Sequence, residues 1–236
     1  MMFYKYSCLG NDFLLVFNKS INQKDISKIL DRHDGVGGDG IIILKSDSKE
    51  FNQIEVFNSD GSKAKMCGNA LKIVASFLYF LYKDKKFIVS LNGNNYEVGG
   101  DGTNFFANVP KARFKRKDGE YYLLNVSNYH AIKIVDNFNE SVFFNDKARF
   151  SGYNITHIKL LSHNEVDTLT YENGVGFTRS CGSAAIAIFT LLNELNIISN
   201  DLILHSKGGT CYLKGTGEIV SNTSEVKLIY KGEIRC

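Results

Sequence analysis

Two long apolar segments dominate the hydrophobic pattern of the chain. Residues 68–82 and 182–195 are hydrophobic on most sides of a helix, and each follows a glycine-containing turn. A helix that is apolar on most of its surface is usually buried. The pattern therefore predicts one buried helix in each half of the chain. A shorter helix is predicted over residues 25–33, where Ile26, Ile29 and Leu30 recur at helical spacing.

Short runs rich in β-branched and aromatic residues predict strands around these helices. In the first half they are residues 13–17, 41–44, 53–57, 87–89, 96–98 and 105–109. In the second half they are residues 121–126, 132–135, 155–161, 168–172, 202–205, 211–213 and 226–230. Because the order of strands, turn, buried helix and strands repeats, we predict two similar α+β domains, residues 1–112 and 113–236.

The predicted boundary falls in a basic segment, residues 111–117, which has five Lys and Arg in seven positions. We interpret it as a solvated linker rather than a nucleic-acid patch, because no aromatic or periodic pattern accompanies the charges. The formal net charge of the 236 residues is only +3, which does not favour nucleic acid or an anionic membrane as a partner. The composition, 44% hydrophobic and 22% charged, is that of a soluble globular protein.

No membrane span or signal peptide is predicted. The longest nearly apolar stretch, residues 70–82, contains Lys72 and is shorter than the roughly 20 residues that a spanning helix needs. The N-terminal residues lack the apolar run and cleavage site of a signal peptide. We therefore expect a cytoplasmic location, where cysteines stay reduced.

Two of the five cysteines occupy equivalent positions before the buried helices. Cys67-Gly68-Asn69-Ala70 precedes the first helix and Cys181-Gly182-Ser183-Ala184 precedes the second. If the two halves face each other, the two thiols meet across the space between them, where small molecules often bind. The matched pair favours a functional interpretation, whereas a single Cys-Gly before an apolar helix is more often a buried small residue and a turn.

A cysteine at a helix N-terminus is suited to acid–base chemistry. The unpaired N–H groups there bind carboxylates and favour thiolate, and the glycine lets a ligand approach the backbone. One thiolate can remove a proton from a carbon while the other thiol delivers a proton to its opposite face, which is a racemase or epimerase reaction. The same N–H groups would stabilise the enolate-like charge that develops. No spacing indicates a metal site, and the glycines of residues 35–40 precede a strand, unlike a dinucleotide fingerprint.

Several further motifs accompany the two cysteines. They are Gly10-Asn11-Asp12-Phe13, Arg32 with residues 35–40, Asn58-Ser59-Asp60-Gly61, Asn128-Tyr129-His130-Ala131, Asn154 and Tyr171-Glu172-Asn173-Gly174-Val175-Gly176. Over the whole chain these motifs resemble the diaminopimelate epimerases, which are cofactor-independent two-thiol enzymes of lysine and peptidoglycan synthesis.

The resemblance implies a fold, a reaction and a set of site residues. It implies two pseudo-symmetric α+β domains, each a mixed β-sheet wrapped around a central apolar helix, and a homodimer. It implies an amino-acid substrate and no cofactor or metal. Cys67 and Cys181 would be the acid–base pair, and Glu172 and His130 would set thiol protonation, with Glu172 also binding the reacting ammonium. The reacting carboxylate would bind near Gly68, Asn69, Gly182 and Ser183, and the remainder of the substrate near Asn11, Asn58, Asn128, Asn154 and Asn173.

The sequence departs from the family at positions that recognise the distal end of the substrate. Asn173 stands where the family has an arginine that grips the distal carboxylate, and Phe177 stands where it has an acid. Three hypotheses follow: a diaminopimelate epimerase in which Arg179 supplies the missing charge, a racemase of another amino acid, or a non-catalytic relative that binds a small ligand. Cys8, Cys211 and Cys236 are expected to have no role in the chemistry.

Overall fold

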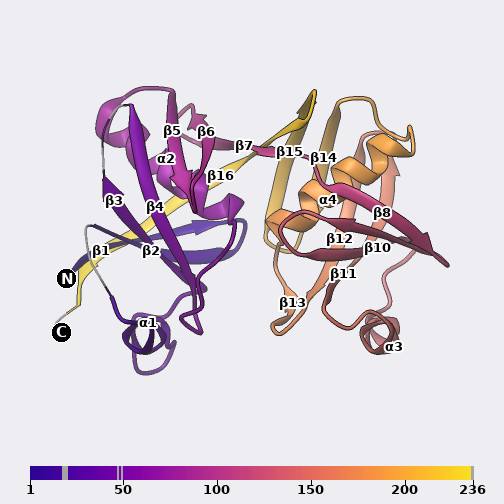
Figure 1. Ribbon diagram of the computed structural model, residues 1–236, viewed down its shortest axis with the longest axis horizontal. Coiled ribbons are helices and arrows are strands. Elements are labelled where there is room, and N and C mark those ends of the chain that lie inside the picture. Colours follow the sequence, from indigo (N-terminus) through magenta and orange to yellow (C-terminus); the bar gives the residue numbers. More distant parts are fainter. Residues whose placement is uncertain (18–20, 47, 49, 235–236) are drawn as a thin grey trace. The chain divides into compact units, whose positions relative to one another are not determined.

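The computed structural model describes residues 1–17, 21–46, 48 and 50–234, so Cys236 lies outside the described residues. The chain forms two compact units (Figure 1). Unit 1 comprises Met1–Asn108 and Thr223–Cys236, and unit 2 comprises Val109–Asn222. Among the described residues, none of the helices combines the length and the apolar character needed to cross a lipid bilayer.

Unit 1 is a mixed sheet with two helices. Its elements are β1 (Met2–Cys8), β2 (Asn11–Phe17), α1 (Gln23–Leu30), β3 (Gly40–Ser46), β4 (Phe51–Asn58), α2 (Gly68–Tyr82), β5 (Lys86–Leu91), β6 (Asn94–Gly100), most of β7 (Asn104–Pro110) and most of β16 (Ile219–Glu233). Strands β2 and β3 are parallel across α1, and β4 and β5 are parallel across α2. The pairs β1–β2, β3–β4 and β5–β6 are antiparallel.

Unit 2 repeats this order of pairings. Its elements are β8 (Arg113–Asp118), β9 (Tyr121–Asn125), β10 (Tyr129–Ile134), α3 (Glu140–Arg149), β11 (Tyr153–Ser162), β12 (Glu165–Glu172), β13 (Gly176–Thr178), α4 (Gly182–Glu194), β14 (Asp201–Ser206) and β15 (Gly209–Thr216). Strands β10 and β11 are parallel across α3, and β12 and β14 are parallel across α4. The pairs β9–β10, β11–β12 and β14–β15 are antiparallel.

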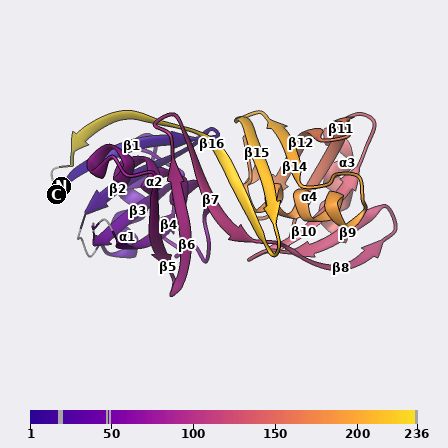
Figure 2. The same ribbon diagram turned by 90° about the horizontal axis from the view of Figure 1, so that it is seen from above.

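The sheet of each unit surrounds its long helix. Helix α2 contacts β1 and β2 as well as β5 and β6, and α4 contacts β8, β9 and β10 as well as β15 (Figure 2). Nine residues in each of these helices are buried, which confirms the two buried helices predicted from the sequence. Apolar burial on this scale is the main stabilising contribution to each unit.

Several features differ from the sequence predictions. The basic segment is not a linker, because Arg113–Asp118 forms the exposed strand β8, paired antiparallel with β9. Helix α3 was not predicted, because Phe143 is its only buried residue and its apolar periodicity is therefore weak. Helix α1 ends at Leu30 rather than near residue 33, since the carboxylate of Asp31 accepts the N–H groups of His33 and Asp34 and forms a turn.

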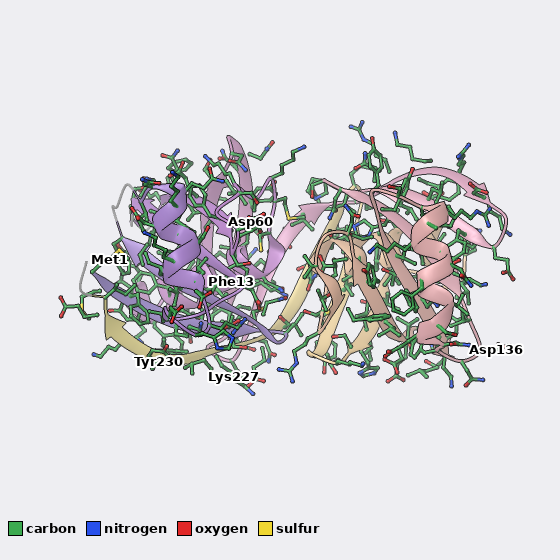
Figure 3. All side chains as sticks on the ribbon, turned by 90° about the horizontal axis from the view of Figure 1, so that it is seen from below. Met1, Phe13, Asp60, Asp136, Lys227 and Tyr230 are labelled. Atoms are coloured by element: carbon green, nitrogen blue, oxygen red, sulfur yellow. The ribbon has the colours of Figure 1, made fainter. Side chains whose placement is uncertain are left out.

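The last strand returns to the first unit. The sequence analysis placed residues after 222 in the second domain, whereas the structure groups them with the first. The physical reason is that β16 pairs antiparallel with β1, from Met2 opposite Glu233 to Cys8 opposite Val226. Figure 3 labels Lys227 and Tyr230 on this strand.

A charged network joins β1, β2 and the loop between α1 and β3 in unit 1. The carboxylate of Asp12 lies 2.7 Å from Lys5 Nζ and accepts two hydrogen bonds from Arg32, at 2.6 and 3.1 Å. Arg32 also contacts Asp39 at 2.8 Å, and Lys5 donates to the Gly37 carbonyl. Burial alone would raise the pKa of Asp12, but the hydrogen bonds from Arg32 and Lys5 outweigh it and hold that pKa well below its usual range.

We predict that Asp12→Asn destabilises unit 1 by about 2–3 kcal/mol at pH 7, because it leaves the buried ammonium of Lys5 without its counter-charge. A carboxyl with a depressed pKa contributes stability above its unfolded pKa of about 3.9 and loses it as the pH falls. The difference in the free energy of unfolding between wild type and variant should therefore become smaller below about pH 4. Urea denaturation at pH 7 and at pH 3.5 measures both effects.

Glu120→Gln is the matched control for this experiment. It removes an ion pair with Lys133 in which the glutamate is exposed, and exposed pairs contribute little. Its denaturation midpoint should stay that of the wild type. An Asp12→Asn midpoint equal to the wild type at pH 7 would show that the network does not stabilise the unit.

Candidate active site

The first group of predicted site residues gathers at the N-terminus of α2. Cys67 is the N-cap residue, in extended conformation, and its Sγ accepts a hydrogen bond from the N–H of Ala70 at 3.4 Å. Gly68 is the first helical residue, and a Cβ placed on it would meet no atom within 4 Å. The first turn of the helix therefore borders open space at Gly68, which suits close approach of a ligand to the backbone.

Asn69 connects this helix end to strand β2. Its Nδ2 donates to Asn11 Oδ1 at 2.8 Å, and its Oδ1 accepts from the Cys8 thiol at 3.5 Å. Asn69 is 4% exposed, and its amide is held in one orientation by the buried Cys8 and the half-buried Asn11. We call Asn11, Cys67, Gly68 and Asn69 the Cys67 cluster. Two members of this cluster, Asn11 and Asn69, are thus hydrogen-bonded to each other.

The turn that leads to Cys67 is held in place by asparagines. Asn58, at the end of β4, donates from Nδ2 to Ser62 Oγ at 3.0 Å. Asn92 donates to the carbonyls of Ala64 and Lys65, both at 2.9 Å. The hydrogen bond of Asn58 to Ser62 therefore fixes the turn, and its predicted contact with substrate stays a prediction.

The second group gathers at the N-terminus of α4. Cys181 is the N-cap residue and lies 3.4 Å from Ser183, measured from Sγ to Oγ. Ser183 Oγ is also 3.0 Å from His130 Nε2, which in turn lies 3.0 Å from Asn128 Oδ1. A continuous chain of polar contacts thus runs from Asn128 to the Cys181 thiol.

Glu172 lies against the same thiol. It ends strand β12, interacts with Cys181 by charge and by hydrogen bond, and accepts a hydrogen bond from Thr178 Oγ1 at 2.7 Å. We call Asn128, His130, Glu172, Cys181, Gly182 and Ser183 the Cys181 cluster. The sequence analysis did not identify Thr178, because nothing in its surroundings in the sequence distinguishes it from other threonines.

The pKa values of both cysteines differ from the expectation for a helix N-terminus. Burial raises the pKa of Cys67 to about 11, against a smaller lowering by the Ala70 N–H. Burial, with the Glu172 carboxylate, raises the pKa of Cys181 further. The expected lowering by the helix end is therefore outweighed by desolvation. Both thiols are protonated at neutral pH in this state.

Burial also determines the state of His130. The side chain is fully buried, and burial lowers its pKa to about 4, so the imidazole is neutral at pH 7. In the part of the chain that the structure describes, its Nδ1 has no hydrogen-bond partner. A neutral imidazole with Nε2 directed at Ser183 can orient the Ser183 hydroxyl toward Cys181 without adding charge.

Two of the residues predicted to bind the remainder of the substrate, Asn154 and Asn173, contact each other in unit 2. Asn154 is buried on β11, opposite His130 in the parallel register with β10. Its Oδ1 accepts from the backbone N–H of Asn173 at 2.9 Å, and its Nδ2 has no hydrogen-bond partner among the described residues. The Asn173 residue itself is exposed. The buried amide of Asn154 therefore keeps one donor that a ligand could use.

Phe177 and Arg179, the two other positions at the predicted distal end, have different surroundings. The Phe177 ring packs against the rings of Phe143 and Tyr171, with centroids 5.1 and 5.3 Å apart. It is therefore a partly buried ring that packs against the apolar core of unit 2, which contains Phe143 of α3. Arg179 is exposed, and its carbonyl accepts from the N–H of Gly208 at 2.8 Å. Its proposed compensation for Asn173 stays a prediction.

No group of three or more His, Cys, Asp or Glu side chains in the described part of the chain is arranged to hold a metal ion. The polar groups at both helix ends are instead amides, hydroxyls, thiols and one carboxylate. Such groups fit a small zwitterion, because N–H groups bind its carboxylate and Glu172 can bind its ammonium.

The comparisons with known proteins agree with this fit. The sequence model of the family "Diaminopimelate epimerase" matches residues 3–114. A diaminopimelate epimerase of Flavobacterium psychrophilum is 27% identical over 255 residues, covering 95% of this chain and 100% of the relative. One from Caldanaerobacter subterraneus subsp. tengcongensis is 28% identical over 274 residues, covering 99% of each chain.

A solved structure shows the same fold at lower identity. The hydroxyproline epimerase of Agrobacterium vitis superposes with a TM-score of 0.74 at 12% identity, covering 99% of this chain and 90% of that one. The chain is thus an isomerase, in the class of epimerases and racemases that share this fold. The resemblance carried by the sequence motifs is confirmed: the chain is related to the diaminopimelate epimerases.

We predict that Glu172→Gln makes Cys181 more reactive. A carboxylate next to a thiol opposes ionisation of that thiol, so removing its charge lowers the pKa of Cys181. The rate of Cys181 alkylation by iodoacetamide at pH 8 should rise about tenfold for each unit of pKa lost. Mass spectrometry of labelled peptides separates Cys181 from Cys67, whose rate should not change.

Glu165→Gln provides the control on the same strand. Glu165 bonds to His205 rather than to a cysteine, so its loss should leave the Cys181 rate unchanged. An unchanged Cys181 rate in a folded Glu172→Gln variant would mean that the carboxylate does not govern this thiol.

Proposed function

We propose that this protein is a cofactor-independent amino-acid epimerase in which Cys67 and Cys181 act on one α-carbon. The proposed substrate is LL-diaminopimelate and the proposed product is meso-diaminopimelate, in the synthesis of lysine and of peptidoglycan precursors. The observation that carries it is the paired arrangement: each unit presents a cysteine as the N-cap of a buried helix, followed by glycine and by a polar residue, Asn69 in one unit and Ser183 in the other.

In the proposed reaction the two thiols exchange protonation states. One sulfur, as thiolate, removes the α-proton, and the other, as thiol, gives its proton to the opposite face of the same carbon. The electron pair of the broken C–H bond is held on the substrate carboxylate and then forms the new C–H bond. The enzyme ends with the protonation states of its two sulfurs reversed, and the reverse reaction restores them.

The N-terminal turns of α2 and α4 have a defined task in this scheme. The negative charge that develops on the carboxylate is stabilised by backbone N–H groups, which the helix leaves unpaired at its first turn. The open space at Gly68 gives a carboxylate access to one such turn. Asn69 lies next to it with its amide fixed between Asn11 and Cys8.

The raised pKa values of the thiols are compatible with this scheme if the substrate changes their surroundings. An ammonium group bound at Glu172 would neutralise the charge that raises the pKa of Cys181. Binding would thereby bring the thiol closer to the ionisation that the reaction needs. Ser183, oriented by His130, would then donate to the thiolate.

A second candidate is a racemase of another amino acid, and Asn173 is the observation that favours it. A neutral amide cannot reproduce the bidentate grip of an arginine on a distal carboxylate, a contact worth about 1.5–3 kcal/mol. The unpartnered Nδ2 of Asn154 is a neutral donor and fits a carboxylate, a carbonyl or a hydroxyl. These two candidates differ in substrate and share the two-thiol chemistry.

Incubation with LL-diaminopimelate in deuterated water under reducing conditions tests the first candidate. We expect meso-diaminopimelate to form with one deuterium at the inverted α-carbon, measured by chiral chromatography and mass spectrometry. A panel of amino acids with neutral, basic and acidic side chains is run in parallel. Deuterium entry only into one of those would select the second candidate, and exchange with none of the substrates would contradict both.

We predict that Cys67→Ala and Cys181→Ala each abolish isomerisation, because each removes one of the two proton carriers. Cys211→Ala is the matched control: Cys211 is a buried cysteine on β15 and has no place in the scheme. It should keep wild-type turnover if circular dichroism shows a folded protein. Turnover at the wild-type rate in either folded active-site variant would rule out the two-thiol mechanism.

A further inference from the structure

Unit 1 contains a lysine that is completely buried. Lys72 lies on the second turn of α2, has no exposed surface, and is among the largest fully buried side chains of the chain. Its Nζ donates to Ser224 Oγ at 2.7 Å. Burying an ammonium group is costly unless polar partners surround it, so its position requires an explanation.

The contacts of Ser224 lead back to the first turn of the same helix. Ser224 Oγ lies 3.4 Å from the Cys8 Sγ, and the Cys8 thiol donates to Asn69 Oδ1 at 3.5 Å. All four side chains are buried, at 6% exposure or less. A chain of contacts thus runs from Lys72 through Ser224 and Cys8 to Asn69, two residues after Cys67.

This chain joins three separate segments. Cys8 ends β1, Ser224 lies on β16, and Lys72 and Asn69 lie on α2. Asn69 is therefore held from one side by Asn11 and from the other by Cys8. A buried side chain that is hydrogen-bonded on both sides keeps one rotamer, which is the condition for a preorganised binding group.

Two residues of this chain of contacts, Cys8 and Lys72, also shift the pKa of the Cys67 thiol through their charges. Burial has the largest effect on the pKa of Cys67 and raises it, and the Ala70 N–H lowers it. Cys8 raises this pKa further, and Lys72 lowers it. Other titratable groups on the strands that pack against α2 include Tyr4, Lys5, Tyr6, Asp12, Lys86, Tyr96 and Glu97. Among these, Asp12 is paired with Lys5 and Glu97 with Lys86. Lys72 is a cation whose charge lowers the pKa of the Cys67 thiol.

We propose that Lys72 is a positioning residue for the half of the reaction that Cys67 carries out. Lys72 fixes Asn69 through Ser224 and Cys8, and it supplies a positive charge that acts on the Cys67 thiol. The inference deepens the proposed function and rests on it. It also gives Cys8 a role that the sequence analysis did not expect. The C-terminal strand β16 contributes to this half of the chemistry by supplying Ser224.

The reactivity of Cys67 tests the proposal without any substrate. Rates of alkylation by iodoacetamide are measured from pH 7 to pH 10 for Cys67 and Cys181 in the same sample, by mass spectrometry of labelled peptides. In Lys72→Met the charge is lost while the volume of the side chain is kept. We expect the Cys67 rate at pH 8 to fall about three- to tenfold, because thiolate is less favoured without the cation.

Two features of the result separate positioning from packing. The Cys181 rate should stay within about twofold of the wild type, whereas a general loosening of the fold would raise both rates. Lys72→Arg keeps the positive charge and should restore the Cys67 rate to within about twofold. A Cys67 rate that is unchanged in folded Lys72→Met would overturn the proposal.

Ser224→Ala gives an independent measurement if Lys72→Met does not fold. It leaves the ammonium in place and removes the oxygen that links it to Cys8, so the Cys67 rate should again fall while the Cys181 rate stays constant. If the alkylation rate of Cys67 depends on pH in folded Ser224→Ala as it does in the wild type, the proposed chain of contacts is contradicted. Because alkylation needs no catalysis, an absence of isomerase activity would refute the proposed function without affecting this result.

Discussion

Burial of the two long helices determines where chemistry can occur in each unit. A helix enclosed by a sheet on most sides satisfies its interior backbone groups within itself, and only its ends present unpaired N–H groups. Cys67 and Cys181 stand at these two ends as N-cap residues. The apolar core thus has a functional consequence: it fixes the helix ends rigidly, and with them the thiols and the amides that could receive a carboxylate.

The two helix ends have similar backbones but different electrostatic surroundings. In unit 1 the ammonium of Lys72 favours ionisation of Cys67, and in unit 2 the carboxylate of Glu172 opposes ionisation of Cys181. Desolvation raises both pKa values and makes each thiol sensitive to such charges, since charge interactions strengthen as water is excluded. The two cysteines are therefore chemically unequal although their positions in the fold correspond.

The sequence predicted what depends on local periodicity and missed what depends on distant contacts. Helix α2 was predicted with its observed limits because its apolar residues are continuous, and the cysteines were found because each precedes such a helix. The chain from Lys72 to Cys8 could not be predicted, since Ser224 is separated from Lys72 by 152 positions and from Cys8 by 216. The role of Phe177 was equally hidden, because Phe143, its ring partner, lies in the helix that was not predicted.

The return of β16 to unit 1 bears on the order in which the protein folds during synthesis. Unit 2 is one continuous segment, Val109–Asn222, whereas unit 1 needs Thr223–Cys236 in addition to its N-terminal part. Translation proceeds from the N-terminus, and domains generally fold in that order. Here the first unit to begin emerging from the ribosome is the last to be completed. Until then the edge of β1 that pairs with β16 stays unpaired, and an unpaired strand edge is prone to aggregation.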